Sequence, residues 1–148
     1  MPRFRFRLQR LLEVRKHFEE LLISELAVSK RRYLNEEEVL NSLKELVGVN
    51  LKRLKKKQER ITSVEEIILS YHYLHQLDHQ IIIQKESLKK IQEEINLITE
   101  KLIKASQKKK VVEKLKERRL NEHKKLLEKI EQGVLDEVGI NLYLRRKR

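Results

Sequence analysis

The chain has 148 residues and a net charge of +12, with 35 Lys and Arg against 23 Asp and Glu. It contains three Gly, one Pro and no Cys, which excludes a disulfide framework and Cys-ligated metal sites and disfavours turn-rich sheet folds. A composition rich in Leu, Ile, Lys, Glu, Gln and Arg is instead typical of long helices and coiled coils.

The first eight residues, Met1–Leu8, are basic and are not followed by an apolar stretch. We therefore expect no secretory signal. No apolar run approaches the roughly 20 residues that cross a bilayer, so the sequence predicts a soluble, cytoplasmic protein without direct membrane insertion. The positive charge predicts an acidic partner, which could be nucleic acid, an anionic membrane or an acidic protein surface.

Apolar residues at alternating steps of three and four predict a first helix over about residues 4–60. We expect its buried seam in two phases separated by a shift. The first phase comprises Leu8, Leu11, Arg15, Phe18 and Leu22, and the second comprises Leu26, Ser29, Tyr33, Glu36, Leu40, Leu43, Val47, Asn50 and Leu54.

A capping box, Ser63-Val64-Glu65-Glu66, predicts a turn at about residues 61–63 and a second helix over about residues 64–138. One unbroken seam is expected along this helix: Ile67, Ser70, Leu74, Leu77, Ile81, Gln84, Leu88, Ile91, Ile95, Ile98, Leu102, Ala105, Lys109 and Val112. Because so short a turn makes the helices antiparallel, the predicted fold is all-α. It is a single coiled-coil hairpin over residues 1–148 whose second helix is longer and overhangs.

The polar seam residues indicate a register. If Asn50 faces Ser70 and Glu36 faces Gln84, polar layers meet polar layers, which fixes register at some cost in stability. A slip of one heptad would also keep the seams facing, and the same seams would serve a swapped dimer.

Beyond Glu117 the second helix has no partner within the predicted hairpin. It still carries an apolar stripe of Leu120, Leu126, Leu127, Ile130, Val134 and Val138. Either Phe4 and Phe6 fold over part of this stripe, or the stripe docks another protein. We expect residues 139–148 to form a basic tail that is disordered from Leu144 onward.

The sequence carries no Gly-rich phosphate loop and no Ser/His/Asp arrangement in a plausible context. A two-helix hairpin also lacks a deep cleft, so we expect no enzymatic activity, no cofactor and no metal. His72, His75 and His79 share a helical face, and the last two have a chelating spacing. Their heptad positions face outward, however, which favours partner contact. Tyr71 and Tyr73 flank that face, and exposed tyrosines are typical of protein interfaces.

Basic residues gather at the end remote from the turn, on both predicted helices. They are Arg3, Arg5, Arg7, Arg10, Arg15 and Lys16, and Lys108, Lys109, Lys110, Lys114, Lys116, Arg118 and Arg119. They are either the ordinary charged flanks of a coiled coil or a cationic end that docks onto an acidic partner. A nucleic-acid-binding coiled coil is a further alternative, although Glu113, Glu117 and Glu122 interrupt the basic run and no nucleic-acid module is present. A generic scaffold that pairs through the overhang is another.

Three motifs together resemble the FliJ family of flagellar export proteins over nearly the whole chain. The first is Phe4-x-Phe6-x-Leu8-Gln9-x-Leu11-Leu12-x-x-Arg15. The second is Tyr73-Leu74-x-x-Leu77-x-x-x-Ile81-x-x-Gln84. The third is Val112-Glu113-Lys114-Leu115-Lys116-Glu117-Arg118-Arg119, followed by Leu135-Asp136-Glu137. The related rod protein of virulence-type secretion systems is the second candidate.

The resemblance implies a non-catalytic stalk that enters the hexameric flagellar export ATPase and promotes its assembly. It also implies contact with the cytoplasmic domain of the export-gate membrane protein and with export chaperones, at the inner face of the cell membrane. The residues placed at the ATPase ring are Phe4, Phe6, Leu8, Arg15, Lys116, Arg118, Arg119, Leu127 and Asp136. Tyr73 occupies the position of the gate-binding aromatic, which is commonly a different aromatic in the family, and Tyr71, His72 and Leu77 are expected around it.

Overall fold

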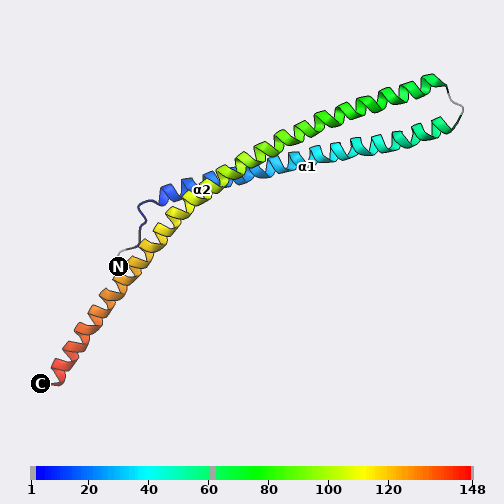
Figure 1. Cartoon of the computed structure of the whole chain (residues 1–148). Coiled ribbons are helices and arrows are strands. Elements are labelled where there is room, and N and C mark those ends of the chain that lie inside the picture. The colour runs from blue at the N-terminus through cyan, green and yellow to red at the C-terminus, as the bar shows by residue number, and fades with distance from the viewer. Residues whose placement is uncertain (1–2, 61–62, 148) are drawn as a thin grey trace. The chain divides into compact units, whose positions relative to one another are not determined.

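The computed structural model of the chain describes residues 3–60 and 63–147, and within these it contains two helices and no strand. Helix α1 spans Gln9–Glu59 (51 residues) and helix α2 spans Val64–Arg146 (83 residues). They pack against each other as an antiparallel hairpin whose second helix is the longer one (Figure 1). The predicted all-α hairpin is therefore confirmed.

The contacts divide the chain into two units. Unit 2 comprises residues 21–102, which hold the turn and the two helix segments beside it. Unit 1 comprises residues 1–20 and 103–148, which hold the start of α1 and the rest of α2. The prediction that the chain is a single domain stays a prediction.

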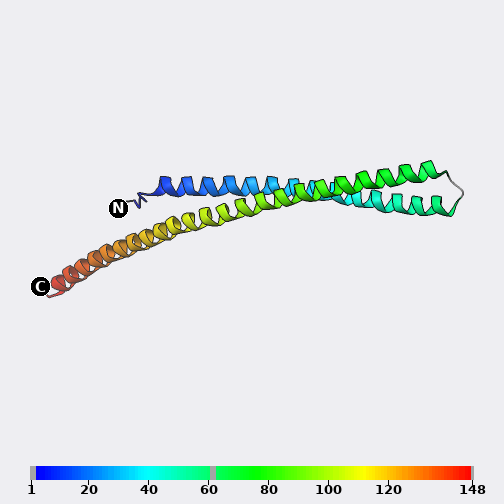
Figure 2. The same cartoon turned by 45° about the horizontal axis from the view of Figure 1, so that its top comes forward.

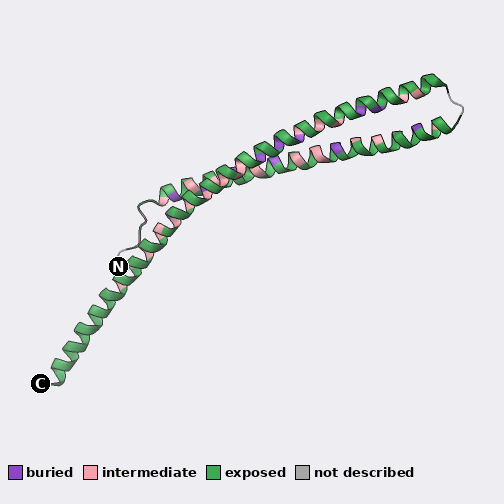
Figure 3. Ribbon diagram, in the orientation of Figure 1, coloured by how far each residue is buried: buried purple, intermediate pink, exposed green. Residues whose placement is uncertain are grey.

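The core of unit 2 is the predicted seam. Every seam position expected between Leu26 and Leu54 on α1, and between Ile67 and Leu102 on α2, is buried or half-buried. The buried apolar side chains are Leu22, Leu40, Leu54, Leu74, Leu77, Leu88, Ile91 and Ile95, and Ser29 is buried as well (Figure 3). The alternating three-and-four spacing keeps these side chains on one stripe of each helix, so the two stripes close on each other.

One polar layer interrupts this core as the register predicts. The Gln84 side-chain amide donates to the Glu36 backbone carbonyl (2.9 Å) and to the Glu36 carboxylate. The second expected layer differs, although both its residues are half-buried. Asn50 donates to the Leu46 carbonyl of its own helix (2.7 Å), and the Ser70 hydroxyl lies 3.4 Å from the Lys57 ammonium nitrogen. Their short side chains therefore find nearer partners than each other.

Helix α2 begins at Val64 because Ser63 caps it. The Glu66 backbone N–H donates to the Ser63 hydroxyl at 3.4 Å, as in a capping box. Most of the predicted turn, residues 61 and 62, lies outside the described residues. The cap explains how α2 starts so soon after α1 ends.

The first helix does not have the predicted phase shift. In unit 1 the seam of α1 runs through buried Leu12 and half-buried Arg15 and Glu19, whereas Leu11 and Phe18 are exposed at 37% and 51%. The seam therefore keeps one three-and-four spacing along α1. The prediction was wrong because it followed the apolar residues: Glu19 holds a seam position, and its carboxylate accepts a hydrogen bond from Lys109 of α2 at 2.9 Å.

Helix α1 begins at Gln9 rather than near residue 4. The first hydrogen bonds are from the Gln9 N–H to the Phe6 carbonyl and from the Leu12 N–H to the Leu8 carbonyl. Residues 3–8 alternate basic and apolar side chains with a period of two, which suits an extended segment rather than a helix.

Helix α2 continues to Arg146, so the predicted end at residue 138 and the predicted disorder from Leu144 are wrong for the described residues. Gly133 and Gly139 lie inside the helix and neither has a positive φ. Each costs a helix only about 1 kcal/mol, and the good helix formers around them outweigh that cost. Arg145 and Arg146 in the last turn also interact favourably with the helix dipole.

Candidate functional site

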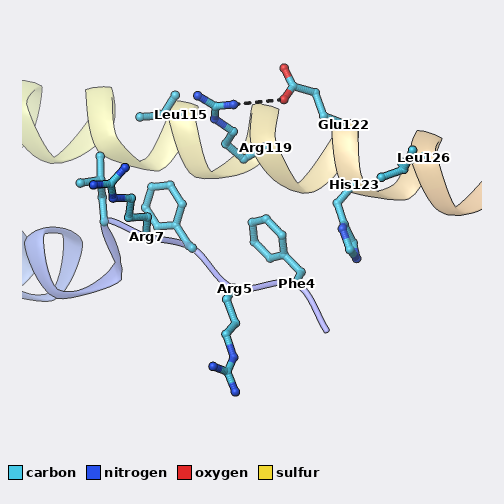
Figure 4. Close-up of a pocket in the computed structure, with 10 residues that line it drawn as sticks. Phe4, Arg5, Arg7, Leu115, Arg119, Glu122, His123 and Leu126 are labelled. Atoms are coloured by element: carbon cyan, nitrogen blue, oxygen red, sulfur yellow. Dashed lines mark ion pairs between the residues drawn. The ribbon is translucent and has the colours of Figure 1, made fainter. Parts of the chain in front are cut away.

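The extended segment of residues 3–8, which we call the strap, lies along α2 within unit 1. Phe4 and Phe6 are half-buried, and the Phe4 ring lies 5.6 Å from the His123 ring, measured between centroids, at a tilted angle (Figure 4). The strap and α2 enclose a hollow whose α2 side is lined by Leu115, Arg119, Glu122, His123 and Leu126. The strap therefore folds over the first part of the overhang.

The strap covers only part of the apolar stripe. Leu120 and Leu127 are half-buried, but Ile130, Val134 and Val138 beyond them are about half-exposed. In Figure 3 the described part of α2 is exposed throughout after residue 127. Both alternatives for the stripe thus keep support, because Phe4 and Phe6 cover its start and nothing in the described chain covers its end.

The residues expected at the ATPase ring all lie in unit 1, but they do not form one cluster. Phe4, Phe6, Leu8 and Arg119 line the hollow. Arg118 lines a separate shallow groove on α2, and Arg15 and Lys116 are half-buried. Leu127 belongs to the covered part of the stripe, whereas Asp136 is exposed farther along and accepts a hydrogen bond from Gln132.

Net charge distinguishes the two units sharply. Unit 1 carries 21 Lys and Arg against 10 Asp and Glu, whereas unit 2 carries 14 against 13. Nearly all of the net charge of +12 therefore belongs to unit 1. Only four ion pairs are found among residues 3–60 and 63–147, and three of them lie in unit 1: Glu19–Lys109, Lys109–Glu113 and Arg119–Glu122. The basic excess there is mostly unpaired, so unit 1 presents a cationic surface to a partner.

The Glu19–Lys109 pair was missed by the sequence analysis. Hydrogen bonding to the Lys109 ammonium lowers the pKa of the Glu19 carboxyl, and the same bond raises the pKa of Lys109. Both groups therefore stay charged at neutral pH. The signal was present in the sequence, because Glu19 lies four residues after Arg15 and three before Leu22, on the seam spacing.

The residues expected at the export gate lie near the turn, in unit 2, and they occupy different sides of α2. Leu77 is only 3% exposed and belongs to the core, whereas Tyr71, His72 and Tyr73 are exposed. Tyr71 and Tyr73 are two residues apart, so they point about 200° away from each other around the helix. They therefore lie on either side of the His72 position and do not share one stripe of the helix.

Two hydrogen bonds that cross the seam identify these sides. The Gln58 amide donates to the Tyr71 hydroxyl (3.2 Å), and Gln58 and Tyr71 each directly follow a seam residue. On the other side Arg32 forms an ion pair with Glu94 (3.4 Å), and each of them directly precedes a seam residue. Tyr73 also directly precedes a seam residue, so it lies on this second side. The Tyr73 side also carries exposed Leu69 and Ile83, which the sequence analysis did not single out. Leu69 lies four residues before Tyr73 and Ile83 lies ten residues after it, so the three side chains lie on one stripe of the helix.

His72, His75 and His79 are exposed on α2. In the part of the chain that the structure describes, no group of three His, Cys, Asp or Glu side chains is placed to hold a metal ion. Over the same residues, neither helix has a stretch long and apolar enough to cross a membrane.

Comparison with known proteins gives one decisive match. The family model described as "Flagellar FliJ protein" matches residues 4–148. The chain belongs to the FliJ family. FliJ-family membership makes it a protein of the flagellar export apparatus, in agreement with the helical hairpin, and it favours the flagellar system over the virulence-type alternative. No curated protein and no solved structure matches the chain.

Proposed function

We propose that this FliJ-family protein is a non-catalytic stalk of the flagellar export ATPase, at the cytoplasmic side of the cell membrane. The observation that carries the proposal is the concentration of the positive charge and of the uncovered apolar stripe in unit 1. A ring-binding stalk needs one end whose surface differs from the rest of the hairpin. Unit 2, with 14 Lys and Arg against 13 Asp and Glu, has a nearly balanced charge.

The ATPase-binding residues we propose are Phe4, Phe6, Leu8, Arg15, Lys116, Arg118, Arg119, Leu127 and Asp136. The exposed arginines would meet acidic side chains of the ring. Leu127 would extend the contact from the strap onto the stripe. The half-buried Phe4 and Phe6 would act by holding the strap in place. Export chaperones are further proposed partners, for which no particular surface is assigned.

The test mixes the protein with the flagellar export ATPase of the same organism and measures ATP hydrolysis and oligomer size together. Faster hydrolysis with a shift towards hexamers is expected. The double variant Arg118→Glu, Arg119→Glu should lose most of this stimulation without losing helicity. Lys55→Glu with Lys56→Glu, on exposed positions of unit 2, is the matched control and should behave like the wild type. Unchanged stimulation by the Arg118/Arg119 variant would remove the basic end from the proposal.

We further propose that the Tyr73 side of unit 2 binds the cytoplasmic domain of the export gate. Tyr73 and His72 would make the contact, Leu77 would hold Tyr73 in position from the core, and Tyr71 would contribute only from the opposite side. Tyr73→Ala should weaken binding of the purified gate domain about tenfold, as for a typical interface aromatic, and should leave ATPase stimulation intact. Ile82→Ala, an exposed position on the Tyr71 side, is the control. Equal gate affinity for both variants would refute this site.

A further inference from the structure

The last turns of α2 have an unusual distribution of side chains. Ile140, Leu142, Tyr143 and Leu144 are each more than half exposed. At 100° per residue Ile140, Tyr143 and Leu144 share one stripe, whereas Leu142 points about 200° away from Ile140. An apolar stripe with this spacing is normally buried, yet this one is open to solvent in the described chain.

Charge follows directly after this apolar stretch. No acidic residue occurs after Glu137; Arg145 and Arg146 end α2, and Lys147 follows directly after it. The Lys147 ammonium lies 5.1 Å from the centroid of the Tyr143 ring. An aromatic ring with a cation beside it and aliphatic side chains below it is the arrangement that settles at a membrane–water boundary.

We propose that the segment from Val138 to Lys147 binds the surface of an anionic lipid bilayer. Ile140, Tyr143 and Leu144 would enter the boundary between headgroups and acyl chains. Arg145, Arg146 and Lys147 would reach the lipid phosphates, since long basic side chains extend towards headgroups while their stems stay in apolar surroundings. This attachment stays at the bilayer surface and does not cross the bilayer. It is therefore compatible with the expectation that the protein does not insert into the membrane.

Two alternative occupants fit less well. A second copy of the chain would bring another strongly basic unit 1 against this one, and the like charges would repel. A single acidic helix packed on this stripe would leave Arg145 and Arg146 without partners, because both point more than 90° away from Ile140 around the helix. A bilayer surface supplies both a continuous apolar layer and many negative charges.

The test is co-sedimentation of the full chain with vesicles of phosphatidylglycerol mixed into phosphatidylcholine, compared with vesicles of phosphatidylcholine alone. Binding is expected with the anionic vesicles and should weaken as salt is raised. Arg145→Gln, Arg146→Gln and Lys147→Gln together should weaken partitioning about 100-fold, because each basic residue near an anionic surface contributes about fivefold. Lys52→Gln, Lys55→Gln and Lys56→Gln remove the same charge from unit 2 and should change partitioning little.

A second pair of variants separates lipid insertion from attraction to any polyanion. Ile140→Gln with Leu144→Gln keeps every charge and should also lose at least tenfold in partitioning, whereas Leu34→Gln with Leu51→Gln, exposed on α1, should not. Equal helicity of all variants by circular dichroism makes the comparison valid. The proposal is overturned if the wild type does not sediment with anionic vesicles, or if it binds both vesicle types equally. It is also overturned if the Ile140/Leu144 variant binds like the wild type, which would indicate an acidic protein or nucleic acid as the partner.

Discussion

Glu19 of α1 and Lys109 of α2 form an ion pair at a seam position, with 2.9 Å between the carboxylate oxygen and the ammonium nitrogen. Their side chains are only 15% and 19% exposed. Two apolar side chains at these positions would have filled the seam without burying any charge. A pair of this kind favours the register in which the two charges meet, because any slip leaves a charge facing apolar side chains.

Removal of the carboxylate tests this pair. Glu19→Gln should lower the thermal midpoint, because the Lys109 ammonium loses its strongest partner and stays in the seam. The exposed pair Arg32–Glu94 provides the control, since Glu94→Gln should have a smaller effect on the same measurement. Equal midpoints for the two variants would show that the partial burial of Glu19 does not matter.

The pH dependence of the same variant has a definite sign. The pKa of Glu19 is lowered in the folded chain, mainly by the hydrogen bond from Lys109. Its stabilising effect is therefore complete above the ordinary carboxyl pKa and is lost as the pH falls through the lowered pKa. The difference in unfolding free energy between wild type and Glu19→Gln should shrink on acidification, as measured by urea denaturation at neutral and acidic pH. A difference that grows towards acidic pH would contradict the assignment.

The Glu36–Gln84 layer predicts non-additive variants. Gln84→Leu should cost about 1–3 kcal/mol, because it leaves a half-buried carboxylate without its donor. Glu36→Leu combined with Gln84→Leu should recover that loss, since two apolar side chains then meet. The double variant should also give mixed oligomers in light scattering, because the layer no longer selects one register. Additive losses in the double-mutant cycle would show that the two side chains do not interact.

Leu77 and Ile83 separate a core role from a surface role on α2. Leu77→Ala should lower the free energy of unfolding by about 2–4 kcal/mol, as for a buried leucine. Ile83→Ala, at a position 53% exposed, should change it by no more than about 0.5 kcal/mol. Urea denaturation followed by circular dichroism measures both. Similar losses from the two variants would place Ile83 in the core and contradict the seam described above.

The strap should open when its aromatic anchors are removed. Phe4→Ala with Phe6→Ala removes two half-buried rings, so the open population should rise roughly 30-fold at about 1 kcal/mol for each partly buried ring. Limited proteolysis by trypsin after Arg5 and Arg7 should accelerate accordingly, because cleavage follows the open population when opening is fast. Phe18→Ala, which removes an exposed ring from α1, is the control. A strap cleaved equally fast in all three proteins would not be held by its aromatic side chains.

The heptad spacing by itself determined the hairpin and the whole α2 seam from Ile67 to Val112. It could do so because an apolar stripe of this length is removed from water only when it packs against a matching stripe on another helix. The same reasoning found the Glu36–Gln84 layer and the Ser63 cap, since both depend on local spacing. The family was indicated by the three sequence motifs and not by the heptad spacing, and its model matches residues 4–148.

The tertiary structure decided those features of the chain that the heptad spacing does not determine. Phe18 is apolar and exposed while Glu19 is charged and in the seam, because Lys109 across the hairpin compensates the carboxylate. Residues 3–8 form a strap and not a helical turn, because Phe4 packs against His123. In both cases the deciding partner is distant in sequence, so only the folded chain shows it.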